Sequence, residues 1–185
     1  MPPSTAASPS PSTPASHLAR LARLRVPLGF ACGVVALVLA HPTLPSLVAG
    51  GLVAVVGESL RFWAAGHLDK GREVTKSGPY RWSGHPLYVG SSIIGLGAAI
   101  ASASVLVFAL AAAYLAVSLA AAIITEEAAL TAKFGTEYVA YRRGQLIDGD
   151  RTFSLARAIS NHEPRTVAGV AVGWVLLALK LWLRV

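Results

Sequence analysis

The sequence predicts an all-α, polytopic membrane protein with a bundle of about five transmembrane helices. Of its 185 residues, 54% are hydrophobic and only 14% are charged. Soluble domains carry about 45–50% apolar and about 25% charged residues, so the shortage of charge points to lipid rather than water around the chain. The stretch from Leu87 to Ile124 contains no charged residue at all. Such a run is typical of membrane spans.

The N-terminal segment differs from the rest of the chain. Residues 1–16 are mostly Pro, Ser, Thr and Ala, with no charged side chain. A segment of this composition buries too little apolar surface to offset its ordering entropy, which predicts disorder. It also lacks the basic start and apolar core of a signal peptide. Residues 17–185 are then expected to form a single transmembrane domain.

The apolar stretches divide the domain into five spans. A bilayer core about 30 Å thick needs roughly 20 apolar helical residues. The charge-free run of 87–124 is too long for one span and fits two, with a reversal at Ser102-Ala103-Ser104. Prolines at positions 42 and 45 mark the turn between the first two spans. The predicted spans are 24–40, 46–66, 87–102, 104–124 and 166–183.

The basic residues lie on alternate connections and so predict the orientation. Arginines precede the first span, and Lys and Arg recur in segments 67–86 and 125–165. The opposite connections, 41–45 and 102–104, contain neither. By the positive-inside rule, the N-terminus and both long polar segments are cytoplasmic and the C-terminus lies outside. The net charge of +7 then faces anionic lipid, and a nucleic-acid partner is not needed to explain it.

Cysteine usage excludes two kinds of site. Cys32 is the single cysteine of the chain, so no intrachain disulfide can form. No second Cys or close His pair accompanies it, and the sequence therefore predicts no metal site.

Two ionisable residues fall inside the second span. Glu58 and Arg61 are three positions apart, which places them on one helical face within pairing distance. Ionisable residues within a span are costly and mark functional sites by default. An ion pair that fixes helix packing is an equally good interpretation.

Two polar clusters flank the charge-free run. The series Gly78-Pro79-Tyr80 and His85-Pro86-Leu87-Tyr88 opens the third span, and Glu126-Glu127 closes the fourth. If 87–124 is a helical hairpin, its two ends meet at the cytoplasmic face. Pro86 suits the first turn of a helix, where its missing N–H costs nothing. The free N–H groups of that turn could bind an anion or a polar ligand.

A third cluster follows the fourth span. Phe134, Tyr138 and Tyr141 lie three or four positions apart, which predicts one aromatic face of an interfacial helix. Taken alone, this pattern is also typical of an aromatic belt at the membrane surface.

These residues, in this order, resemble the isoprenylcysteine carboxyl methyltransferases and their bacterial relatives. The resemblance covers about residues 55–183 and extends to the tail NHEPRTVAGVAVGWVLLALK. It rests on Leu60-Arg61, Trp63-Ala64, Gly78-Pro79-Tyr80, His85-Pro86, Tyr88, Gly90, Glu126-Glu127, Leu130, Phe134-Gly135, Tyr138 and Tyr141.

The resemblance implies an integral-membrane methyltransferase that uses S-adenosyl-L-methionine at the cytoplasmic face. It assigns cofactor contacts to His85, Tyr88, Gly90, Glu126, Glu127, Tyr138 and Tyr141. Catalytic or substrate-steering roles fall to Arg61, Arg81 and Glu127, with Arg142 as a further cation for an anionic substrate group. One position departs from the family pattern: Gly84 stands where the family usually has Arg. Arg81 or Arg61 could then replace that missing arginine.

The expected acceptor is a lipophilic small molecule or a prenylated substrate, reached from the bilayer, and the expected location is a bacterial inner membrane. Three other interpretations stay open. A phospholipid N-methyltransferase would share the architecture and would tolerate Gly84, because an amine acceptor needs no arginine to hold a carboxylate. A steroid-reductase-type enzyme with a nicotinamide cofactor would share the HPxY segment. A non-enzymatic membrane scaffold could retain the motifs without activity.

Overall fold

The computed structural model describes residues 14–145, 149 and 151–183, with side chains from residue 27 onward, and every regular element in this part of the chain is helical. The predicted disorder of 1–16 falls largely outside the described residues, and the first helix begins at Pro14. The elements are α1 (Pro14–Leu39), α2 (Leu44–His67), the 3-10 helix η1 (Gly78–Arg81), α3 (Pro86–Ser102), α4 (Val105–Phe134), α5 (Thr136–Arg142), α6 (Leu155–Ser160) and α7 (Glu163–Leu183).

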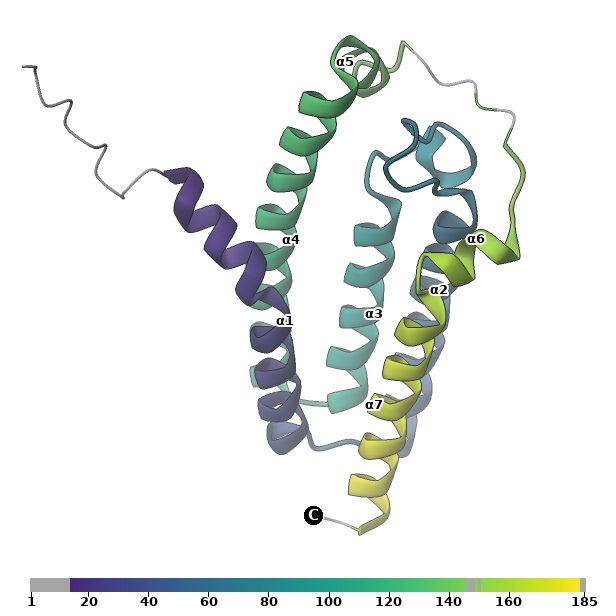
Figure 1. The fold of residues 1–185 in the computed structure, drawn as a ribbon. Helices are drawn as coiled ribbons and strands as arrows, with labels where there is room; N and C mark the ends of the chain where they lie inside the picture. Colours follow the sequence, from purple (N-terminus) through teal and green to yellow (C-terminus); the bar gives the residue numbers. More distant parts are fainter. Residues whose placement is uncertain (1–13, 146–148, 150, 184–185) are drawn as a thin grey trace, which may run out of the picture.

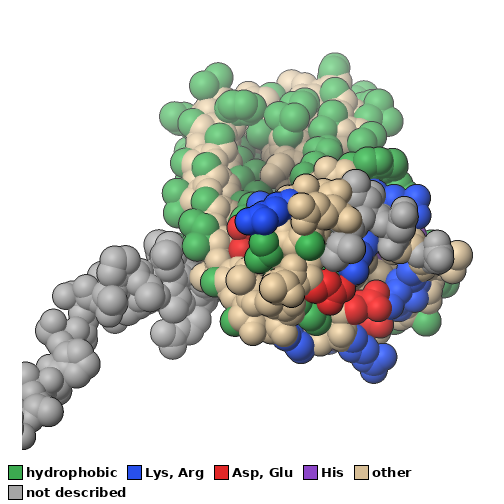
Figure 2. All heavy atoms as spheres, turned by 90° about the horizontal axis from the view of Figure 1, so that it is seen from above, with side chains coloured by type: hydrophobic (Ala, Val, Ile, Leu, Met, Phe, Trp, Pro, Cys, Tyr) green, Lys and Arg blue, Asp and Glu red, His purple; other side chains and the backbone are tan. Residues whose placement is uncertain are grey.

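The five longest helices form a bundle in which α1 packs on α4, α4 on α3, α3 on α2 and α2 on α7 (Figure 1). The α2–α3 connection with η1, and α5, lie at one end of this bundle (Figure 1). We call this the polar end. The α1–α2 and α3–α4 connections lie at the opposite end, where α7 also finishes. Seen from the polar end, Lys, Arg, Asp and Glu side chains gather over the connections, while hydrophobic side chains cover the helices (Figure 2).

The structure confirms three of the five predicted spans by length and composition. The helices α2, α4 and α7 are long and apolar enough to cross a membrane. The other two predicted spans correspond to shorter apolar stretches, Pro27–Leu39 in α1 and Pro86–Ser102 in α3. Their crossing of the membrane stays a prediction, as does the side on which the polar end lies.

The predicted hairpin reversal is confirmed. Helix α3 ends at Ser102, and Ala103 adopts a left-handed conformation with φ of 48°. The Ser104 side chain then accepts a hydrogen bond from the Val107 N–H and caps α4. Helix α4, however, continues to Phe134, ten positions beyond the predicted end at residue 124. The added segment is rich in Ala and Glu, which favour helix, and it stops only at Gly135 with its φ of 52°.

Glycines allow α2 and α3 to approach each other closely. A Cβ atom at Gly57 would lie 2.7 Å from the Gly90 carbonyl oxygen and 2.8 Å from the Ile94 backbone nitrogen. Gly50, seven residues before Gly57, faces Gly97, seven residues after Gly90, in the same way: a Cβ at Gly97 would lie 2.6 Å from the Gly50 carbonyl oxygen. Small residues that bring backbones together are the usual basis of helix association in lipid. This seam fixes α3, and with it the polar residues at the start of α3.

Substitution of Gly57 by Ala is expected to destabilise the protein by about 1–3 kcal/mol, because the new methyl group would press on backbone atoms of α3. Chemical unfolding in detergent measures the effect. Gly173 in α7 is the matched control, since a Cβ there meets nothing within 4 Å. Gly173→Ala should be neutral or slightly stabilising, and equal losses in the two variants would contradict the close seam.

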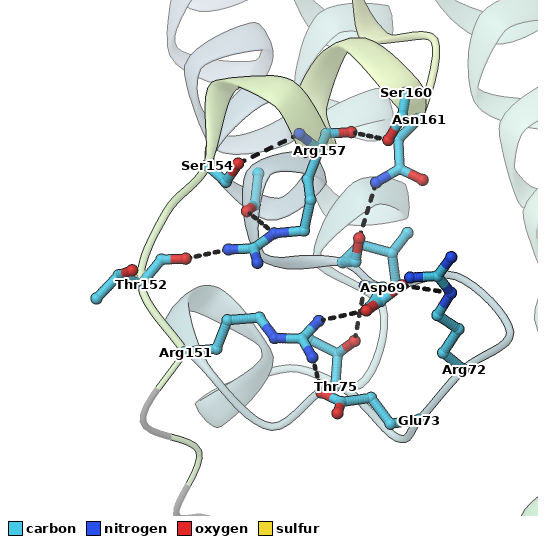
Figure 3. A network of polar contacts seen from close by, with 12 residues as sticks. Asp69, Arg72, Glu73, Thr75, Arg151, Thr152, Ser154, Arg157, Ser160 and Asn161 are labelled. Atoms are coloured by element: carbon cyan, nitrogen blue, oxygen red, sulfur yellow. Dashed lines mark hydrogen bonds and ion pairs between the residues drawn. The ribbon is translucent and has the colours of Figure 1, made fainter.

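A polar network joins the segment before α6 to the end of α2 (Figure 3). The Arg151 guanidinium pairs with Asp69 at 3.3 Å and with Glu73 at 2.7 Å. The Asn161 amide donates to the Ala65 and Leu68 carbonyl oxygens, both at 2.9 Å, and so satisfies the last turn of α2. Helix α6 is not predicted from the sequence, because its six residues are too few to show a helical apolar period.

Candidate functional site

The two ends of the α3–α4 hairpin meet at the polar end. His85 Nε2 lies 2.9 Å from Glu127 Oε1, and the Tyr88 hydroxyl donates to Glu126 Oε2 at 2.6 Å. The His85 and Tyr88 rings stack with their centroids 5.7 Å apart. The structure therefore brings together the residues that the sequence analysis placed at the start of one helix and near the end of the next.

Local helix geometry explains how two adjacent carboxylates reach two partners. His85 is the residue just before α3, and Pro86 fills the first helical position without an N–H to satisfy. Residues 85 and 88 are three apart and lie on the same side of α3. Glu126 and Glu127 point about 100° apart on α4, so each carboxylate takes a different one of the two partners.

Arg142 adds a cation that the sequence analysis did not place next to Glu127. Its Nη2 lies 2.7 Å from Glu127 Oε1, the same oxygen that faces His85. A Cβ atom at Gly84 would lie only 2.8 Å from Arg142 Nη1. The guanidinium of Arg142 therefore lies against position 84, where the resemblance expects an arginine. The turn at Gly135 precedes α5, which contacts the α2–α3 connection at Tyr80 and Gly84.

The two tyrosines of α5 line the same region. Their ring centroids are 6.2 Å apart, and the Tyr141 hydroxyl donates to the Tyr80 carbonyl oxygen at 2.7 Å. Tyr138 is buried, and its hydroxyl has no hydrogen-bond partner among the described residues. Burial raises the pKa of Tyr138, with a further contribution from Glu127. The phenol is thus protonated at neutral pH and can donate to a bound ligand.

Burial also raises the pKa of Tyr141 to about 12, above the value of about 10 for a free tyrosine. A raised folded pKa gives stability that is complete below about pH 10 and is lost as the pH rises toward about 12. Tyr141→Phe should lower the unfolding temperature at pH 8 through the lost hydrogen bond, and the deficit should shrink above pH 10. Thermal unfolding across pH 8–11.5 measures this, and a deficit that grows above pH 10 would contradict the buried, protonated phenol.

Arg61 has a different partner from the one predicted. Its guanidinium binds Glu163 of α7 through two hydrogen bonds of 2.8 and 3.1 Å, and the Glu163 side chain is 3% exposed. It also donates to the Leu87 carbonyl, Ser91 and Thr166. The predicted pair with Glu58 is therefore wrong. Glu163 is 102 positions away in sequence, but it offers a buried carboxylate with both oxygens in reach, which Glu58 on the same helix does not.

Arg81 and Gly90, two other predicted site residues, lie outside this cluster of contacts. Arg81 donates to the Gly149 carbonyl oxygen at 3.1 Å. Gly90 is buried in the seam with α2, where a Cβ would lie 2.5 Å from Arg61 Cγ. This packing role is distinct from the predicted cofactor contact, which stays a prediction.

The group of residues around Glu127 fits the chemistry of S-adenosyl-L-methionine. That molecule carries ribose hydroxyls and an ammonium group, which bind carboxylates, a carboxylate, which binds cations, and an adenine ring, which stacks on aromatic side chains. The polar end supplies Glu126 and Glu127, Arg142 and the tyrosines. The buried hydroxyl of Tyr138 has no hydrogen-bond partner among the described residues. Burying a hydroxyl without a hydrogen bond costs about 1–3 kcal/mol, so this group points specifically to a bound ligand.

Comparison with known proteins gives one family. Residues 48–137 match the model of the phospholipid methyltransferase family. The match spans just under half of the chain, from early in α2 to the first turn of α5. It includes His85, Tyr88 and both glutamates, whereas Tyr141 and Arg142 lie beyond it. No curated protein and no solved structure matches the chain.

Proposed function

We propose that this chain is an integral-membrane methyltransferase that takes a methyl group from S-adenosyl-L-methionine at its polar end and transfers it to a lipophilic acceptor. The observation that carries the proposal is the pairing of His85 with Glu127 and of Tyr88 with Glu126. These contacts join the two ends of the hairpin inside the segment similar to phospholipid methyltransferases. The positive-inside pattern supports a cytoplasmic position for the polar end.

An apolar cavity supports the lipophilic acceptor. A space of about 620 Å³ lies between α1, α3, α4 and α7, within the range of about 300–1,000 Å³ that ligand pockets occupy. Its lining is almost entirely apolar and includes Gly95 on α3 and Leu115 on α4. Gly95 is seven residues, or about 10 Å, along α3 from Tyr88. An acyl or prenyl chain in this cavity would hold its head group near the hairpin ends.

The arginines around the site support one class of acceptor over the other. A carboxylate acceptor, as in isoprenylcysteine methylation, would need a free cation to hold it. Arg61 is bound to Glu163, Arg81 to a backbone carbonyl and Arg142 to Glu127. This favours an amine acceptor, as in phospholipid N-methylation, over the carboxylate acceptor.

The role of the chain's residues is mainly to hold and orient. The bound donor supplies a methyl group on a positively charged sulfur. Glu127, held between His85 and Arg142, has a fixed orientation and an exposed fraction of 31%, so it can accept from the donor's hydroxyl or ammonium groups. Tyr138 can donate from its protonated hydroxyl. Fixed placement of two reactants can remove about 7–11 kcal/mol of a barrier.

The proposal is tested with the purified protein in lipid nanodiscs and S-adenosyl-L-methionine labelled in the methyl group. Three acceptors are supplied separately: phosphatidylethanolamine, an S-farnesyl cysteine analogue with a free carboxylate, and a long-chain thiol. We expect label in the amine lipid. Label only in the carboxylate would refute the amine acceptor and keep the methyltransferase. No transfer to any acceptor, together with no donor binding, would refute the proposed function itself and favour the scaffold.

A further inference from the structure

We propose that the outer face of α2 carries a second binding site, for the ammonium head group of a membrane lipid, formed by Glu58 with the aromatic side chains of Phe62, Trp63 and Phe153. This site shares no residue with the group around Glu127. It is a lipid-binding site in its own right, and it holds whether or not the chain transfers methyl groups.

The first observation is an unpaired carboxylate. Both carboxylate oxygens of Glu58 are shielded from solvent and have no hydrogen-bond partner among the described residues. The nearest arginine on the same helix, Arg61, is occupied by Glu163. The neighbouring Ser59 hydroxyl donates to the Val55 carbonyl. A buried carboxylate without a hydrogen bond is unfavourable. Arg61, whose charge acts on Glu58, is already bound by Glu163, so the carboxylate can take a donor or a cation from a ligand.

The second observation is the groove in which Glu58 lies. It has a volume of about 360 Å³ and is lined by Val55, Glu58, Ser59, Phe62, Trp63 and Phe153. Phe62 and Phe153 contact each other with ring centroids 5.8 Å apart. A carboxylate surrounded by aromatic rings can bind an ammonium group. The carboxylate pairs with the positive charge, and the ring faces attract the same cation. An anionic ligand would instead be repelled by Glu58.

The position of the groove identifies the occupant as a lipid. Leu52, Val55 and Val56, on and beside this face of α2, are 61–67% exposed, and α2 is one of the helices able to cross a membrane. Trp63 contacts the exposed Trp82, and tryptophans of this kind mark the membrane interface. Glu58 lies five residues, or about 7.5 Å, deeper along α2. A head group entering the groove from the bilayer surface therefore approaches Glu58, whose shielded carboxylate oxygens would become accessible on rotation of the side chain toward the groove.

The test compares lipid retention by native mass spectrometry. Wild-type protein in detergent is mixed with equal amounts of phosphatidylcholine, which carries an ammonium group, and phosphatidylglycerol, which does not. We expect one phosphatidylcholine molecule to be retained in preference, and Glu58→Gln to reduce that preference by about tenfold or more. Glu137→Gln is the matched control, because Glu137 is an exposed carboxylate paired with Lys76 away from the groove. Its preference should equal that of the wild type.

Three further measurements test the proposal. Glu58→Gln should unfold at or above the wild-type temperature in lipid-free detergent, since it removes an unfavourable buried charge that has no hydrogen-bond partner among the described residues. A clear loss of stability there would show that Glu58 is paired internally and would overturn the proposal. Equal retention of both lipids by the wild type, or tight binding of free choline in place of the lipid, would also overturn it. Binding of S-adenosyl-L-methionine should be unchanged in Glu58→Gln, and its loss would place Glu58 in the donor site instead.

Discussion

Glu127→Gln is expected to weaken binding of S-adenosyl-L-methionine by at least about tenfold, because hydrogen bonds to charged groups contribute about 1.5–3 kcal/mol each. One Glu127 oxygen faces both His85 and Arg142. An amide of the same shape removes the charge that holds these two side chains together. The Arg142 guanidinium would then be free to turn away from position 84. Methyl transfer should fall further than binding, since the donor would also lose its orientation.

Equilibrium dialysis with labelled donor and a methyl-transfer assay measure the two effects. Glu137→Gln is the control, because it removes a carboxylate from α5 without touching the group around Glu127. Binding by Glu127→Gln at the wild-type level would remove Glu127 from the donor site. If Glu127→Gln bound the donor as the wild type does but no longer transferred the methyl group, Glu127 would act in the reaction and not in donor binding.

Arg61→Ala is expected to destabilise the protein by about 3–5 kcal/mol, the usual result of removing one partner of a buried ion pair. Arg61 links α2 to α7 through Glu163 and Thr166 and to α3 through Leu87 and Ser91. The variant would leave the Glu163 carboxylate buried without its cation. Every one of these contacts is lost at once, so the three helices should separate more easily.

A double-mutant cycle measured by chemical unfolding in detergent separates packing from catalysis. Arg61→Ala with Glu163→Ala should recover part of the stability lost in Arg61→Ala, because no unpaired charge remains. Additive losses would contradict the ion pair. Full stability of Arg61→Ala together with lost methyl transfer would instead support the catalytic role that the resemblance assigns to Arg61.

The sequence was sufficient to predict the features that depend on local signals. The helical hairpin follows from the charge-free run of 87–124, and its reversal at 102–104 is where the structure places it. Once the hairpin is known, the meeting of His85 with Glu127 follows from the topology. Helix α4 runs ten residues beyond the predicted span, because the charged residues that mark the end of a span also favour helix.

Contacts between distant segments could not be predicted in the same way. The spacing of Glu58 and Arg61 favoured a local pair, but the carboxylate that binds Arg61 comes from α7. The approach of Arg142 to Gly84 depends on the turn at Gly135 and on the direction of α5. Neither the Arg61–Glu163 contact nor the Arg142–Gly84 contact can be predicted from individual sequence positions, because both depend on how whole helices pack.

The most direct test of the donor site is photo-cross-linking of methyl-labelled S-adenosyl-L-methionine to the purified protein, followed by peptide mapping. We expect saturable labelling confined to peptides that contain residues 80–90 and 126–142, and we expect unlabelled donor to suppress it. Labelling that is not saturable, or that lies only in α1 or α7, would contradict a donor site at the meeting point of the two hairpin ends.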